Sequence, residues 1–163
     1  MRTSASSART RVLKIIVSSG FVLSFAGEAL AGPEKTVKVT ATGQIVSREF
    51  CSATELCQEV HVTGNASQIG RVSGVLFERV DVTTGRYAGT GVFTTPDGST
   101  ITTQFAGQAG IPDQDGRTPF AESHQVVSGT GQFENASGSL DLQGTGDANG
   151  QLVIVGIGTF IKG

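Results

Sequence analysis

The chain has 163 residues, a formal net charge of −2, a single tyrosine and no tryptophan. This length suits one domain with one hydrophobic core, and the acidic balance argues against a protein that binds nucleic acid or anionic membranes. Gly, Thr, Ser and Val are abundant, and no stretch keeps a helical apolar period for three turns. The composition therefore favours an all-β domain.

Residues 1–31 have the features of a signal peptide. An apolar run over residues 15–25 ends in Ala29-Leu30-Ala31, an A-x-A cleavage site before Gly32. The run is short for a bilayer span, which leaves an uncleaved membrane anchor as the alternative. It follows a basic region made of Arg2, Arg9, Arg11 and Lys14. We predict a signal peptide over 1–31 and a single domain over 32–163, secreted or periplasmic and free of the membrane after cleavage.

Removal of that segment changes the charge of the mature chain. Four of the 12 basic residues and one of the 14 acidic residues are lost, which leaves 8 basic and 13 acidic side chains and a formal charge of −5. We therefore expect no nucleic-acid partner.

The mature part divides into eight short segments with strand character. A Pro96-Asp97-Gly98 turn predicts a hairpin between the fourth and fifth, and an Asn149-Gly150 turn precedes the last. Eight antiparallel strands close naturally into an up-and-down β-barrel, with an open sandwich as the main alternative. The predicted strands cover residues 36–46, 59–63, 72–82, 86–95, 99–107, 120–128, 139–144 and 151–161.

Cys51 and Cys57 are the only cysteines, and both follow the predicted cleavage site. An oxidising compartment favours a disulfide that closes the loop between the first two strands, and a free or reactive thiol pair is the alternative. A zinc site would need two further ligands, and none is nearby. Asp113-Gln114-Asp115-Gly116 has the D-x-D-G core of a calcium loop, but His124 occupies the place of the distal glutamate. We therefore expect no metal site.

Strand alternation separates the two histidines. His61 shares a polar face with Glu59 and Thr63, as a surface residue would. His124 and Glu122 instead share a face with Phe120 and Val126.

By the same alternation, Glu78 shares a face with Leu76, Val80 and Val82. Burial inside a barrel would raise the pKa of such a carboxyl group and suit it to acid–base work. These faces could also line the outside or the wet mouth of the barrel. We take Glu78, Glu122 and His124 as candidate ligand-binding residues, and no catalytic residue is assigned.

A glycine-rich corner over residues 129–138 reads as strand, tight turn, short helical turn and strand. Phe133 is its one large apolar side chain, so we predict that it plugs one end of the space enclosed by the strands. A ligand loop is the alternative to this structural corner, whose key residues are Gly129, Gly131, Phe133 and Gly138.

This corner resembles the G-T-G-x-F-x-x-A-x-G turn of the allene oxide cyclase and dirigent-type barrels, including secreted bacterial proteins of that kind. The match runs through Gly129, Thr130, Gly131, Phe133, Ala136 and Gly138. The resemblance implies an eight-stranded barrel with an apolar cavity, no metal or organic cofactor, and compatibility with a homo-oligomer. It transfers no catalytic residue, because no position outside the corner aligns with one.

Two functional hypotheses follow. The first is a secreted barrel that binds a small apolar molecule or serves as a structural or accessory domain. The second, implied by the resemblance, is a cofactor-free isomerase or cyclase. Glu78, Glu122 and His124 directed into an open apolar cavity would favour the second, whereas a filled interior would favour a structural role.

Overall fold

The computed structural model describes residues 32–163, and the predicted signal peptide lies outside them. These residues form eight strands and one short 3-10 helix, η1, which spans Gly131–Phe133. No helix within residues 32–163 is long and apolar enough to cross a bilayer. The strands are β1 Lys35–Phe50, β2 Glu55–Ala66, β3 Gly70–Asp81, β4 Arg86–Thr94, β5 Thr100–Ala109, β6 Thr118–Gly129, β7 Ser137–Gly146 and β8 Gln151–Ile161.

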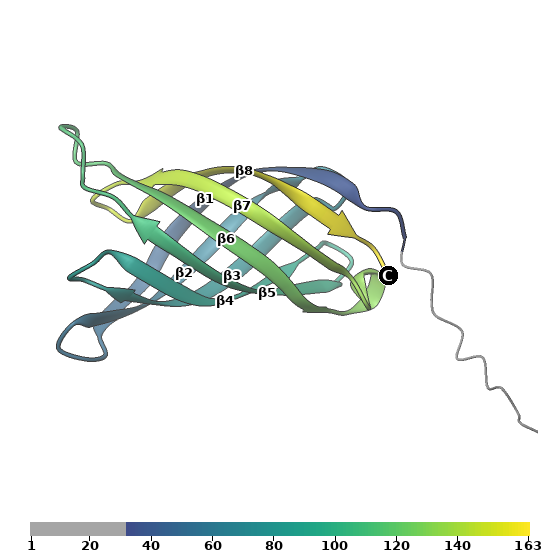
Figure 1. The fold of residues 1–163 in the computed structure, drawn as a ribbon, viewed down its shortest axis with the longest axis horizontal. Helices are drawn as coiled ribbons and strands as arrows, with labels where there is room; N and C mark the ends of the chain where they lie inside the picture. The colour runs from purple at the N-terminus through teal and green to yellow at the C-terminus, as the bar shows by residue number, and fades with distance from the viewer. Residues whose placement is uncertain (1–31) are drawn as a thin grey trace, which may run out of the picture.

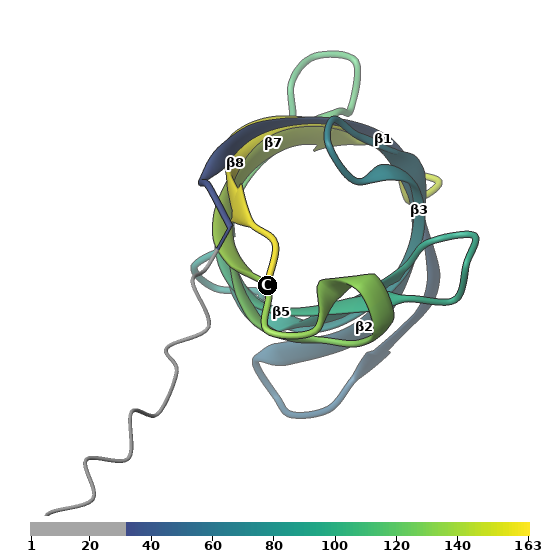
Figure 2. The same ribbon diagram turned by 90° about the vertical axis from the view of Figure 1, so that its right-hand side faces the viewer.

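Each strand pairs antiparallel with its neighbours in sequence, and β1 pairs with β8 to close the barrel. Figure 1 shows the strands running obliquely along the barrel, and Figure 2 shows the ring end-on. The prediction of a closed eight-stranded barrel is confirmed, and the open sandwich is excluded. Closure gives the outer edges of β1 and β8 backbone partners, which an open sheet would leave unpaired.

The first hairpin differs from its predicted form. β1 continues to Phe50 and β2 begins at Glu55, so Cys57 lies within a strand and the connecting loop is only residues 51–54. A register shift between Ile45 and Ser47 leaves Val46 as the extra residue of a bulge. The polar residues beyond the bulge stay in the strand because they pair with β2. Their composition alone does not predict a strand.

The third strand begins two residues earlier and ends one residue earlier than predicted. β3 ends at Asp81, whose Oδ1 accepts hydrogen bonds from the backbone N–H groups of Thr83 and Thr84 at 2.8 and 3.2 Å. These bonds turn the chain, and Val82 is exposed in the turn. The expectation that Val82 shares the inner face with Leu76 is therefore wrong.

The corner at residues 129–138 closes one end of the barrel. Phe133 is 1% exposed and packs edge-to-face against Phe160, with ring centroids 5.8 Å apart. Gly131 has a φ of 59°, a left-handed conformation that favours glycine. The cluster at this end consists of Val37, Ala66, Ile101, Phe133, Ala136 and Phe160. Phe133 is thus buried within the apolar cluster at this end of the barrel.

A second apolar cluster fills the middle of the barrel. Its fully buried members are Val60, Val62, Leu76, Tyr87, Phe105, Leu142 and Ile154. Beyond this layer, toward the opposite end from Phe133, the interior is no longer filled by side chains.

Candidate functional site

A cavity of about 460 Å³ occupies the open half of the barrel. It is lined where β1, β3, β5 and β7 end and where β2, β4, β6 and β8 begin, together with residues of the β5–β6 and β7–β8 connections. These connections lie together at the left of Figure 1, opposite the corner that contains η1. The apolar side chains of the lining include Ile45, Leu56, Val60, Val62, Leu76, Val80, Phe120, Leu152 and Ile154.

Polar side chains line the same cavity. They are Arg48, Gln58, Glu78, Tyr87, Thr118, Glu122 and Asp147. Strand alternation places Glu78 between Leu76 and Val80 on β3, and Glu122 follows Phe120 on β6. The predicted inward orientation of both carboxyl groups is thus present in the structure.

Glu78 ends a hydrogen-bonded chain that begins at the mouth. Arg48 Nε donates to Gln58 Oε1 at 3.0 Å, and Gln58 Nε2 in turn donates to Glu78 Oε1. Burial raises the pKa of Glu78 to about 7, and the negative charge of Glu122 acts in the same direction. The bond from Gln58 and the charge of Arg48 oppose this rise. Glu78 can therefore gain or lose a proton near neutral pH.

Glu122 is the centre of a second and deeper network. Tyr87 Oη donates to Glu122 Oε2 at 3.0 Å, and His124 Nε2 lies 3.0 Å from Glu122 Oε1. The other ring nitrogen of His124, Nδ1, is 2.9 Å from Thr103 Oγ1. Burial and the charge of Glu122 raise the pKa of Tyr87 well above its usual range, so its hydroxyl group remains a donor.

His124 supports this network from below the cavity. It is 1% exposed, stacks on Phe105 with centroids 4.6 Å apart, and is not part of the cavity wall. Two residues along a strand advance it by about 7 Å, which carries it into the packed middle layer. The structure thus brings Glu78 and Glu122 to the cavity and places His124 behind Glu122.

Sequence reasoning missed five of the polar lining residues, namely Arg48, Gln58, Tyr87, Thr118 and Asp147. Arg48 faces inward because the bulge at Val46 shifts the alternation of β1, and Gln58 lies in a segment whose polar composition predicts a loop. Tyr87 carried one signal in the sequence, because it is the only tyrosine of the chain. Gly107 on β5 leaves the space that the Tyr87 ring occupies, since a Cβ atom there would overlap the ring.

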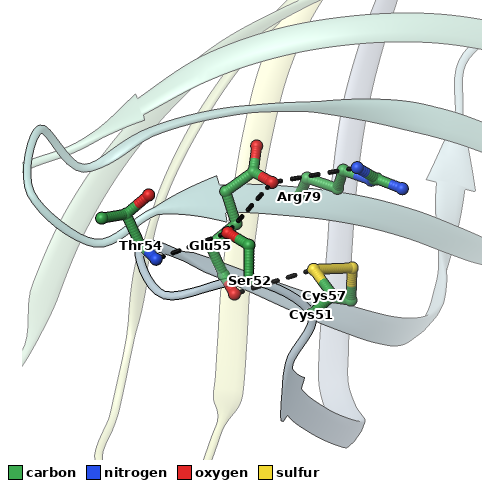
Figure 3. Close-up of a disulfide and its surroundings, with 6 residues drawn as sticks. All are labelled: Cys51, Ser52, Thr54, Glu55, Cys57 and Arg79. Carbon is green, nitrogen blue, oxygen red and sulfur yellow. Dashed lines mark hydrogen bonds and ion pairs between the residues drawn. A yellow bond between two sulfur atoms is a disulfide. The ribbon is translucent and has the colours of Figure 1, made fainter.

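The first hairpin closes next to the cavity mouth. Cys51 and Cys57 form a disulfide with a Cα–Cα distance of 5.7 Å, which confirms the predicted bridge (Figure 3). Glu55 Oε2 accepts a bond from Ser52 Oγ at 3.3 Å and lies 3.8 Å from Arg79 Nη1. The bridge and these contacts restrain the strand pair that carries Arg48 and Gln58.

The second histidine, His61, lies on the outside of the barrel. His61 is exposed and pairs with Glu59, with Nε2 and Oε1 2.6 Å apart, as its polar strand face predicted. In residues 32–163, no three His, Cys, Asp or Glu side chains are grouped so that they could hold a metal ion.

Comparison with known proteins finds a similarity of structure but no match of sequence. No family model and no curated protein sequence matches the chain. Among solved structures it is similar to the pterocarpan synthase dirigent protein GePTS1, with 14% identity over 80% of this chain and 84% of that chain, and a TM-score of 0.45. At this level of similarity, the fold class rests on the strand pairing of the chain itself.

Proposed function

We propose that the protein is an exported barrel that binds a small, mostly apolar molecule in its open half. The observation that carries this proposal is the cavity of about 460 Å³, lined largely by apolar side chains with a few convergent polar groups. Small-molecule sites in proteins commonly have this size and composition.

The uneven filling of the barrel supports a binding role over a purely structural one. Eight-stranded barrels can be packed solid with side chains, as the Phe133 end is here. Glu78 instead remains at the cavity wall with its pKa raised to about 7, an arrangement that costs folding free energy. A purely structural role gives no reason to keep a carboxyl group in this unfavourable position.

A cavity-filling variant tests the binding role. Val80→Trp should abolish binding of a neutral naphthalene-based fluorescent probe, because Val80 lines the cavity. Val92→Trp is the matched control, since Val92 is exposed on the outer face of β4. Binding should be measured by fluorescence titration, with the circular dichroism spectrum as the check on folding. If neither the parent chain nor the control binds the probe, a structural or accessory role replaces the proposal.

Cofactor-free isomerisation or cyclisation is the second candidate, and the state of Glu78 favours it. A carboxyl group with a pKa of about 7 beside an apolar cavity is suited to proton transfer at neutral pH. The test compares the products of a spontaneously cyclising unsaturated epoxide with the protein, without it, and with Glu78→Gln. A product ratio unchanged by the protein would refute this candidate.

We also propose that the mature chain is exported with an N-terminus at or near Gly32. The disulfide between Cys51 and Cys57 is consistent with an oxidising compartment. The intact mass of the exported protein tests this directly, and a product that retains residues 1–31 would contradict it.

A further inference from the structure

Around Glu78 and Glu122, the cavity wall offers a ligand more hydrogen-bond acceptors than donors. One of the two amide N–H groups of Gln58 is used on Glu78, and the hydroxyl group of Tyr87 is used on Glu122. Arg48 donates to Gln58 through Nε and keeps further N–H donors, but it is exposed at the mouth. A carboxylate oxygen can accept more than one hydrogen bond, so Glu78 and Glu122 retain free acceptor capacity.

The charged side chains around the cavity are mostly acidic, which suits a ligand that donates hydrogen bonds. Glu78 on β3, Glu122 on β6 and Asp147 in the β7–β8 turn face it, against the single cation Arg48 on β1. Tyr87 on β4 remains neutral, and His124 lies behind Glu122. In an apolar enclosure, carboxylates are stabilised by a cation that comes within hydrogen-bonding distance.

We propose that the ligand of this cavity is an amphipathic amine, an apolar body that carries one protonated primary or secondary amine bound between Glu78 and Glu122. This inference depends on the proposed binding function and specifies the chemical class of its ligand. The apolar body would lie against Leu76, Val80 and Phe120. Phe120 and Tyr87 add two aromatic rings to the lining, and an aromatic ring attracts a cation placed over its face.

Binding of such an amine should depend on pH in one direction. The ammonium group prefers the ionised form of Glu78, so binding below pH 7 must release the proton that Glu78 then holds. Amine affinity should therefore rise between pH 6 and pH 8. A neutral ligand of the same shape should show no such rise.

Three matched probes test the proposal by calorimetric titration of the exported protein. They are 1-naphthylmethylamine, the neutral 1-naphthalenemethanol and the anionic 1-naphthoate. At pH 8 the amine should bind about tenfold or more tightly than the alcohol, as a charge-assisted hydrogen bond would give. The alcohol reports on the proposed function alone. If it binds and the amine is no tighter, or if the naphthoate is tightest, the amine inference is overturned. If none binds, the binding function fails with it.

Variants locate the effect within the cavity. Glu78→Gln should weaken amine binding about tenfold and leave alcohol binding nearly unchanged, whereas Glu59→Gln on the outer face should change neither. Arg48→Met should strengthen amine binding by removing a like charge, and the exposed Arg71→Met should have no effect. An unchanged amine affinity in both Glu78→Gln and Arg48→Met would contradict the proposal. A folding defect is recognised separately, because it would weaken binding of the amine and of the alcohol together.

Discussion

His124 Nε2 lies 3.0 Å from Glu122 Oε1 inside the barrel, and both side chains are almost completely buried. The same Glu-x-His spacing occurs at Glu59 and His61, but that pair is on the outer face. One sequence pattern thus gives a solvated pair on β2 and a buried network on β6. The two pairs allow a direct comparison of what burial does to the same contact.

Glu122→Ala should destabilise the domain by about 2–4 kcal/mol. The substitution leaves the Tyr87 hydroxyl group and His124 Nε2 without their acceptor in the interior. Glu59→Ala breaks the exposed pair and should change the free energy of unfolding by less than about 0.5 kcal/mol. Urea denaturation of both variants measures the contrast. Equal losses would show that the inner network contributes no more than a surface pair.

Glu78 should make the protein more stable at pH 5 than at pH 8. Its pKa in the folded state is about 7, above the ordinary value of 4.5 for a glutamate, so the folded state binds the proton more tightly than the unfolded state. The stabilisation is fully present below pH 4.5 and is lost as the pH rises through 7, by about 3 kcal/mol in total. Asp97, whose pKa is lowered to about 2 by the Thr95 and Ser99 hydroxyl groups, stays ionised over this range.

Glu78→Gln isolates this effect. The variant should lose that part of the pH dependence and be more stable than the parent chain at pH 8, when measured by urea denaturation at both pH values. Glu59→Gln serves as the control and should keep the parent profile. A variant less stable than the parent at pH 8 would show that Glu78 is not an unfavourably buried carboxylate.

Phe133→Ala should cost about 3–5 kcal/mol of unfolding free energy, the usual range for a buried aromatic residue. Phe133 is 1% exposed and contacts Phe160 at the closed end of the barrel. The neighbouring Glu134→Ala should be nearly neutral because Glu134 is exposed. Thermal melts would measure both, and an unchanged melting temperature for Phe133→Ala would contradict the plug assignment.

Reduction of the Cys51–Cys57 disulfide should destabilise the domain by at most about 2–3 kcal/mol, because the bridged loop is short. Thiol titration of the exported protein under denaturing, non-reducing conditions should find no free sulfhydryl group. A Cys51→Ser/Cys57→Ser variant should still fold and show a lowered melting temperature. Two reactive thiols in the exported protein would contradict the bridge.

Local sequence determined the strands and most of their faces. Period-two alternation and the turns at residues 96–98 and 149–150 are local properties, and they were sufficient for eight strands and for the inward direction of Glu78 and Glu122. The disulfide also followed from local information, since the chain has only two cysteines. Phe133 stood out as the one large apolar side chain in its corner.

Contacts between distant segments decided the rest. Closure depends on the pairing of β1 with β8, which no window of sequence contains. The bulge at Val46 reverses the alternation that follows it and so brings Arg48 to the cavity mouth. Depth along the barrel axis separates Glu122 at the cavity wall from His124 beneath it, because each depth is filled by side chains from several strands. Alternation states which side of the sheet a residue faces, and only packing across the barrel decides whether that residue meets open space or other side chains.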